Sequence, residues 1–208
     1  MSQTLAPPAA GSKAEATRAA IIDTAERLFR TLGYQKTAVA DIARELRMSP
    51  ANVYRFFASK AAINEAICTR ILAGLEDLAW DIARGPGSAP ERLRALFRAL
   101  QEQTIALFFH EKKMHDMVGA AMQEHWPVID AHVESIETAI RHILMDGQAK
   151  GSFATLDANV TAKIVHTSIV AFIHPQVVEQ CADDDDQAGL ADAMAGFVLR
   201  ALRPHPDD

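Results

Sequence analysis

The side chains with the clearest chemical potential lie between residues 37 and 60, where small, amide, hydroxyl and cationic groups follow one another closely. Ala51 is small enough to let a helix approach the edge of a base. Asn52 can donate to and accept from adenine, and Arg55 can form a two-bond fork with guanine or hold a phosphate. This combination is typical of a segment that reads DNA. The candidate DNA contacts are Thr37, Arg47, Ser49, Pro50, Ala51, Asn52, Tyr54, Arg55 and Lys60.

Three of these candidates suit the phosphate backbone rather than the bases. Lys60 adds positive charge to the first turn of a predicted helix, where unpaired N–H groups already favour a phosphate, and Thr37 stands at the start of another. Tyr54 offers a rigid hydroxyl. The alternative for Tyr54 and Phe57 is a role as core aromatics, which we accept for Phe57. For Tyr54, the hydroxyl beside Arg55 and Lys60 favours a phosphate contact.

Two short helices joined by a tight turn are needed to position these groups. Thr37 can cap the first helix. Ser49 can cap the second, with Pro50 in the first helical position, where its missing N–H costs little. Only residues 47–49 separate the two helices, which predicts a helix-turn-helix whose second helix can enter the major groove. Ser59 then opens a long helix that continues to about residue 83.

Helical periodicity and capping signals continue through the rest of the chain. The pattern Ser12-Lys-Ala-Glu15 predicts the start of a helix that ends at Gly33, a residue suited to the left-handed conformation after a helix. The segment Gly85-Pro-Gly-Ser-Ala-Pro90 is the clearest break. Alternating Val, Ile and Thr are scarce, which argues against an all-β fold. Further helices are predicted at about 90–109, 112–123, 127–149, 157–173 and 187–202, with Gly147 and Gly151 flanking the end of the third of these.

Composition limits the class of protein. The chain has 208 residues, 49% of them hydrophobic, which is typical of a globular protein with one large or two small domains. Residues 1–60 hold nine Lys and Arg against five Asp and Glu, a balance of +4. Residues 61–208 hold twelve against twenty-two, a balance of −10, which gives the net charge of −6. A basic first quarter on an acidic body indicates contact with a polyanion.

The sequence also bears on the cellular setting. Two cysteines, Cys68 and Cys181, cannot form a disulfide framework and favour a reducing compartment. No apolar stretch reaches the roughly 18 residues that span a membrane. The first residues lack the basic region and apolar core of a secretory signal. We therefore expect a cytoplasmic protein with no membrane partner.

The run from Thr37 to Lys60, TAVADIARELRMSPANVYRFFASK, strongly resembles the DNA-binding motif of the TetR family of bacterial transcriptional regulators. Ala25-Glu-Arg-Leu-Phe29 and Gly33-Tyr34 match the first helix and turn of that family, so the resemblance covers about residues 17–67. By position, it places the DNA contacts at Thr37, Ser49, Ala51, Asn52, Tyr54, Arg55 and Lys60.

This resemblance implies an all-α fold, with an N-terminal three-helix helix-turn-helix DNA-binding domain and a helical C-terminal ligand-binding and dimerisation domain. We assign residues 1–11 to a disordered arm and residues 12–60 to the DNA-binding domain. Residues 61–208 then form the effector-binding and dimerisation domain.

Three positions depart from the family pattern. Arg47 stands where the turn usually has Gly, so it is strained if this position needs a positive φ, or else the turn differs. Arg47 could also supply an extra phosphate contact. Phe56 replaces a Tyr or His that could reach a phosphate. Ala62 replaces an acidic residue that would complete a capping box with Ser59, which weakens the start of the long helix by about 0.5–1 kcal/mol.

Large, adaptable side chains gather between residues 105 and 126 and suit an apolar pocket for a small molecule. A plain hydrophobic core is the alternative for each of them. The candidate effector-binding residues are Phe108, Met114, Met117, Met122, Trp126 and His166.

Seven of the eight histidines lie between residues 110 and 174. His110, Glu111 and His115 could bind Zn²⁺ or Ni²⁺, which leaves a metal-responsive regulator, or a metal-dependent enzyme, as an alternative. No HExxH, nucleophile elbow or phosphate loop supports an enzyme. We therefore predict no catalytic residue, no cofactor and no metal site, and interpret the histidines as solvated or hydrogen-bonded.

The last two predicted helices carry apolar stripes. In a monomer these stripes could pack inward, whereas the resemblance implies a symmetric four-helix dimer interface. A dimer would hold two recognition helices about 34–36 Å apart, at successive major-groove faces of a palindromic operator. We thus predict a homodimeric repressor released from its operator by a small, largely apolar effector; an adaptor that lost DNA binding through Arg47 is the remaining alternative. The candidate interface residues are Ile164, Ile169, Phe172, Met194, Phe197 and Val198.

Overall fold

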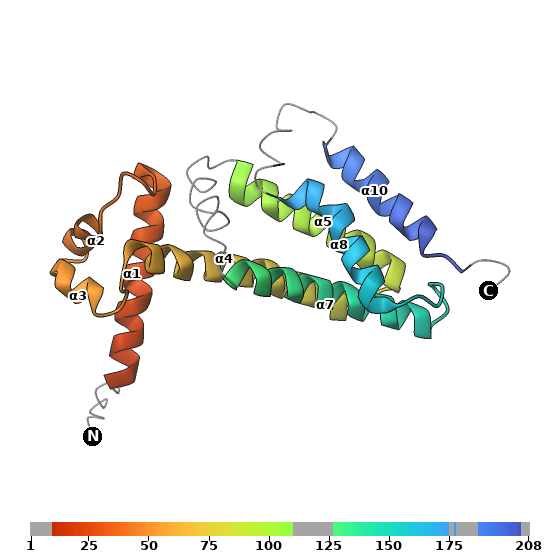
Figure 1. The fold of residues 1–208 in the computed structure, drawn as a ribbon, viewed down its shortest axis with the longest axis horizontal. Coiled ribbons are helices and arrows are strands. Elements are labelled where there is room, and N and C mark those ends of the chain that lie inside the picture. The colour runs from red at the N-terminus through yellow and green to blue at the C-terminus, as the bar shows by residue number, and fades with distance from the viewer. Residues whose placement is uncertain (1–9, 110–126, 175–176, 178–186, 205–208) are drawn as a thin grey trace, which may run out of the picture.

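The fold is built from helices. The computed structural model describes residues 10–109, 127–174, 177 and 187–204, and no strand occurs among them (Figure 1). The predicted all-α fold is therefore confirmed. The elements are α1 (Ala10–Leu32), α2 (Val39–Glu45), α3 (Pro50–Tyr54), α4 (Lys60–Arg84), α5 (Ala89–Thr104), the π-helix η1 (Ile105–Phe109), α7 (Pro127–Ala149), α8 (Ala158–Ile173) and α10 (Gln187–Ala201).

The first three helices and the start of α4 enclose a core of their own. Ile21 and Phe29 of α1, Ile42 of α2 and Ile63 of α4 are fully buried in it. Figure 1 shows α2 and α3 together on one side of α1. Cys68 completes this core, and burial raises the pKa of its thiol to about 12, so it behaves as an inert apolar side chain.

The long helix α4 belongs to two cores. Ile63 and Ile67 lie in the first core, whereas Leu75 and Ala79 lie in the second. With 25 residues, α4 spans about 37 Å. The domain boundary that we placed after residue 60 thus falls at the first residue of a helix that both cores share.

The second core forms the body of the molecule, where α5, α7, α8 and α10 gather around the second half of α4. Figure 1 shows α7 running alongside α4, and α5 contacts both α4 and α10. No described helix combines the length and the apolar character needed to cross a bilayer. The largest fully buried side chains of the body are Leu93, Leu96, Phe97, Ile136 and Ile140.

Two helix starts agree with their predicted caps. The hydroxyl of Ser49 accepts a hydrogen bond from the backbone N–H of Asn52 at 3.2 Å, and Pro50 occupies the first position of α3. The hydroxyl of Ser59 accepts from the N–H of Ala62 at 3.0 Å and begins α4. Each serine satisfies a donor that the helix itself leaves unpaired.

The predicted cap at Thr37 is wrong. Helix α2 begins at Val39, after Ala38, whose N–H donates to the carboxylate of Asp41 at 2.9 Å. This backbone hydrogen bond lowers the pKa of the Asp41 carboxyl. Thr37 instead donates its hydroxyl to the carbonyl of Gly33 at 2.9 Å and holds the loop that follows α1. Gly33 ends α1 with φ +99°, as predicted for a residue after a helix.

A second expectation about a helix start is also wrong. Helix α1 begins at Ala10, so Ser12 lies inside it rather than capping it. Helix α7 ends at Ala149, between Gly147 and Gly151, as predicted, and the ring of Phe153 packs so closely that a Cβ at Gly147 would stand 2.2 Å from it. The glycine is required for the approach of the loop that follows α7.

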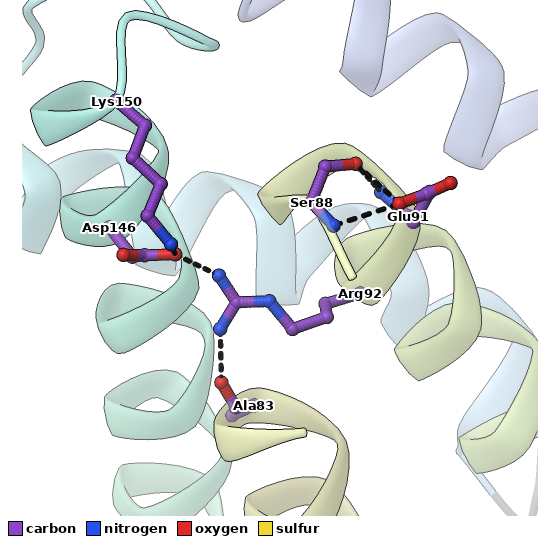
Figure 2. Close-up of polar contacts among 6 residues, drawn as sticks. All are labelled: Ala83, Ser88, Glu91, Arg92, Asp146 and Lys150. Carbon is purple, nitrogen blue, oxygen red and sulfur yellow. Dashed lines mark hydrogen bonds and ion pairs between the residues drawn. The ribbon is translucent and has the colours of Figure 1, made fainter. Parts of the chain in front are cut away.

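A buried arginine joins three helices of the body. Arg92 of α5 donates to the carbonyl of Ala83 in α4 and to the carboxylate of Asp146 in α7 (Figure 2). Lys150 donates to the same carboxylate at 2.9 Å, and its hydrogen bond, with that from Arg92, lowers the pKa of Asp146. A buried guanidinium is stable only when its charge is paired, so this cluster holds the end of α4 against α5 and α7.

Candidate nucleic-acid interface

The turn between α2 and α3 is closed by two backbone hydrogen bonds. The N–H of Met48 donates to the carbonyl of Ala43 at 2.9 Å, and the N–H of Arg47 donates to the carbonyl of Arg44 at 3.1 Å. This is a Schellman motif, in which the residue after the cap adopts the left-handed conformation. That residue is Arg47, with φ 54°. Of the two possibilities left open for this turn, the structure shows the one with a positive φ, and Arg47 occupies a place that favours glycine.

Helix α3 presents one face to solvent. Ala51, Tyr54 and Arg55 are exposed and stand at positions i, i+3 and i+4, which share a face of a helix. Val53, on the opposite face, is fully buried in the first core. The side chain of Tyr54 is 51% exposed, so it is available to a partner and is no core aromatic.

Two other side chains at α3 face the protein more than the solvent. Asn52 is half-buried, and its amide donates to the sulfur of Met48 at 3.7 Å. Phe57 is buried, as we had interpreted it, and the guanidinium of Arg18 lies 4.3 Å from the centre of its ring. Arg18 comes from α1 and was not singled out in the sequence, because no local pattern relates it to α3.

Two of the predicted phosphate contacts are engaged within the protein. Lys60 donates to the carbonyl of Tyr34 at 2.9 Å and lies 4.3 Å from the centre of that ring. An ammonium has three donors, so Lys60 keeps two for a phosphate. Thr37 is 1% exposed, and its hydroxyl proton is used on Gly33. The structure thus places Thr37 inside the loop and away from a phosphate.

The charges around α3 are mostly uncompensated cations. Arg47 precedes the helix and Arg55 ends it, and neither forms an ion pair with any residue that the structure describes. Arg44, in contrast, pairs with Asp41 of its own helix. Unpaired guanidinium groups at both ends of an exposed helix suit contact with the phosphates of a double-stranded polyanion.

Most of the predicted effector residues lie outside the described part of the chain. This applies to Met114, Met117, Met122 and Trp126, and only the backbone of Phe108, in η1, is described. His166 of α8 is 8% exposed, so the structure places it inside the body.

His166 belongs to a polar cluster that the sequence did not reveal. Its Nδ1 lies 3.6 Å from a carboxylate oxygen of Glu137, while Nδ1 of His132 lies 3.2 Å from one of Glu76 in α4. Burial lowers the pKa of both imidazoles, so both are neutral near pH 7. These four residues come from three helices, so no spacing in the sequence connects them.

Among the residues that the structure describes, no three His, Cys, Asp or Glu side chains gather closely enough to hold a metal ion. His110, Glu111 and His115, the set considered for a metal, lie outside these residues. No observation on the described residues favours a metal-responsive regulator or a metal-dependent enzyme.

The predicted interface residues separate into two groups. Ile164 and Phe197 are 64% and 62% exposed and remain candidates. Ile169, Phe172 and Val198 are buried in the body core. Their prediction as interface residues is therefore wrong. Both α8 and α10 bear apolar residues on two faces, and the sequence alone does not distinguish the inner face from the outer one. Met194 is partly buried and packs against the same core.

Two further apolar residues of the predicted stripes are exposed. Val160 precedes Ile164 by one turn of α8 and is 55% exposed, and Leu190 precedes Phe197 by two turns of α10 and is 52% exposed. The helical spacing of four and seven residues places each on the same helix face as the exposed candidate that follows it.

Comparison with known families agrees with this architecture. Residues 21–67, which include α2 and α3, match the model for "Bacterial regulatory proteins, tetR family". Residues 89–193, half of the chain, match the model for "Tetracyclin repressor-like, C-terminal domain". The chain belongs to the TetR family. It is therefore a TetR-family transcriptional regulator, and α2, the turn and α3 form the helix-turn-helix of that family. No curated protein sequence matches it.

Solved TetR-family structures show the same fold. A TetR-family transcriptional regulator from Pectobacterium atrosepticum superposes with a TM-score of 0.75 at 20% identity, over 94% of this chain and 98% of that one. The fatty acid degradation regulator FadR from Bacillus halodurans superposes with a TM-score of 0.67 at 18% identity, over 98% and 100%. The regulator RolR, in complex with resorcinol, superposes with a TM-score of 0.59 at 18% identity, over 94% and 92%.

Proposed function

We propose that this TetR-family regulator is a dimeric repressor that binds a palindromic operator through α3 and leaves it when a small, largely apolar effector binds the body. The observation that carries the proposal is the exposed face of Ala51, Tyr54 and Arg55, with unpaired Arg47 beside it. In this proposal the chain acts by binding alone and is not an enzyme.

The side chains divide between bases and backbone. Ala51, Asn52 and Arg55 read base edges in the major groove, with Arg55 forming a fork on guanine. Tyr54 and Lys60 hold phosphates. These contacts position the helix but carry no sequence information.

Dimerisation is supported by the apolar side chains of α8 and α10. Val160, Ile164, Leu190 and Phe197 are all more than half exposed, and the two helices contact each other. We call these four side chains the outer apolar face. Such a face is expected to meet a partner, and a second copy supplies the two-fold symmetry that a palindrome requires.

An apolar effector is supported by the relatives. RolR holds resorcinol, and FadR is a regulator of fatty acid degradation. For release, the effector must bind the conformation that does not fit the operator more tightly than the one that does, because equal affinity for both shifts nothing.

The first experiment selects bound fragments from sheared genomic DNA of the source organism at about 150 mM salt. Enrichment of one near-palindrome supports the proposal. A folded dimer that enriches no fragment, alone or with candidate effectors, contradicts it.

Variants then test the placement of α3 on the selected operator. Arg55→Ala is expected to relax the preference for one base position at a cost of about 1–3 kcal/mol. Lys60→Gln is expected to weaken all sequences alike and to reduce the slope of log affinity against log salt by about 1. Arg98→Ala, an exposed arginine on α5, is the matched control and leaves both unchanged. Unaltered affinity and preference in Arg55→Ala would show that α3 is not the reading helix.

A further inference from the structure

A cavity of about 350 Å³ lies between the start of α5, the loop after α7 and the last turns of α10. These segments lie at the end of the body away from α1, α2 and α3 (Figure 1). Pro90, Phe153 and Leu199 give the cavity an apolar wall. Three arginines also line it: Arg94 of α5, Arg200 of α10 and Arg203, which follows the end of α10. Three arginines around one hollow stand out in a body whose residues carry a net charge of −10. We call this hollow the arginine cavity.

Two of these guanidinium groups lie close to Gly196, which has no side chain to separate them. From the point where a Cβ on Gly196 would stand, Nη1 of Arg200 lies 3.6 Å away and Nη2 of Arg94 lies 3.9 Å away. The two nitrogens are therefore at most about 7.5 Å apart, the sum of these distances. Two charge-assisted hydrogen bonds of about 2.8 Å, with the spacing of two oxygens in one carboxylate or phosphate, cover such a gap.

Two carboxylates accompany the three arginines: Glu91, which also lines the cavity, and Asp192, which pairs with Arg94, so the arginines remain in excess by one charge. The carboxylate of Glu91 accepts from the backbone N–H of Ser88 at 2.8 Å and from its hydroxyl at 2.7 Å (Figure 2). Asp192 accepts from Nη1 of Arg94 at 3.1 and 3.2 Å, which leaves Nη2 of that side chain for the cavity.

The other two arginines have no such neutralising partner. Neither Arg200 nor Arg203 forms an ion pair with any residue in the described ranges. The cavity thus combines excess positive charge, forked donors and an apolar wall. A planar fork matches the paired oxygens of a carboxylate or phosphate, and the apolar wall suits a hydrocarbon or aromatic group attached to them.

We propose that the arginine cavity binds a small anion through a carboxylate or phosphate group, which bridges Arg94 of α5 to Arg200 of α10 and to Arg203 just after it. Bound there, the anion removes the repulsion between the three cations and ties α10 to α5. The site is separate from α3 and does not depend on the proposed operator binding, so it is tested without DNA.

Titration calorimetry on the full chain, with ionic strength held constant by NaCl, is the test. The probes are benzoate, acetate and inorganic phosphate. Saturable binding of benzoate at least tenfold tighter than acetate identifies an organic acid with an apolar group. Equal or tighter binding of phosphate identifies a bare oxyanion. Absence of saturable binding for all three overturns the proposal.

Three variants locate any binding that is observed. Arg200→Gln is expected to weaken it at least tenfold. Gly196→Leu is expected to abolish it by filling the space between the guanidinium groups, and it keeps α10 folded because leucine is a better helix former than glycine. Arg98→Gln, an arginine of the same helix as Arg94 that pairs with Asp192 but does not line the cavity, stays within twofold. Equal affinity in Gly196→Leu and the unaltered chain would place the anion elsewhere and overturn the proposal.

Discussion

The strained turn residue Arg47 gives the most direct test of how this helix-turn-helix is built. Its φ of 54° lies in the left-handed region, which costs a residue with a Cβ about 1–2 kcal/mol. Arg47→Gly removes that cost, but it also increases the conformational entropy of the unfolded chain. This second effect lowers the free energy of unfolding by about 0.4–1 kcal/mol. The expected result is a net gain of about 0.5–1 kcal/mol in the free energy of unfolding. For a chain of this size, that raises the melting temperature by about 1–4 °C.

The matched control is Arg47→Ala, which removes the same guanidinium and keeps the strain. Urea unfolding followed by circular dichroism should place Arg47→Ala within about 0.5 kcal/mol of the unaltered chain and below Arg47→Gly. Arg47→Asn should fall between them, because asparagine tolerates the left-handed region.

Binding of the two variants to the operator separates the side chain from the backbone. If Arg47 holds a phosphate, both variants lose about 1 from the slope of log affinity against log salt. Equal stability of Arg47→Gly and Arg47→Ala would refute the argument that this turn stores strain. A lower stability of the glycine variant would show that the unfolded chain dominates instead.

Three further predictions concern the body. Phe197→Glu places a charge in the outer apolar face and should yield monomers in light scattering. The control Met145→Glu, at a residue of α7 that is 57% exposed, should leave the oligomeric state unchanged. A Phe197→Glu variant that stays dimeric would show that the interface lies elsewhere. Gly147→Ala should lower the free energy of unfolding by about 1–3 kcal/mol, because the new Cβ would lie 2.2 Å from the ring of Phe153. The control Gly74→Ala adds a Cβ in open space on α4 and should raise the free energy of unfolding by up to about 1 kcal/mol. Burial lowers the pKa of His132, so the unfolded chain binds more protons than the folded one as the pH falls below about 6.5. The urea midpoint should therefore drop between pH 7.5 and pH 5.5, and His132→Gln should reduce that drop.

Several features governed by neighbours in the sequence were predicted correctly, although the caps at Ser12 and Thr37 were not. Ser49 and Ser59 cap the next helix through N–H groups three residues away, and Gly33 ends α1 through its own φ. The positive φ at Arg47 was one of two possibilities that the resemblance, with its usual glycine there, left open. In each case the deciding interaction lies within one turn of helix.

Features that depend on contacts across the fold could not be predicted. Ile169 and Phe197 belong to similar apolar stripes, yet the first is buried and the second is 62% exposed. The two faces of a helix are distinguished only when its neighbours are known. The pairing of Arg92 with Asp146 joins residues 54 positions apart, and no pattern in the sequence marks it.

The attachment of Arg92 to the carbonyl of Ala83 has a consequence for how the molecule can move. It holds one end of a straight helix, while the other end, at Lys60, is packed into the core that carries α3. A tilt that keeps Leu75 and Ala79 packed in the body core must then pivot near Leu75. About 15 residues, or about 22 Å of helix, separate Leu75 from Lys60, so a tilt of about 8° carries Lys60 by about 3 Å, roughly the length of one hydrogen bond. In a symmetric pair the two displacements add in the spacing of the recognition helices. If the proposed dimer binds its operator through α3, an angular change of α4 that is small enough to preserve the packing of the body is large enough to break hydrogen bonds to DNA.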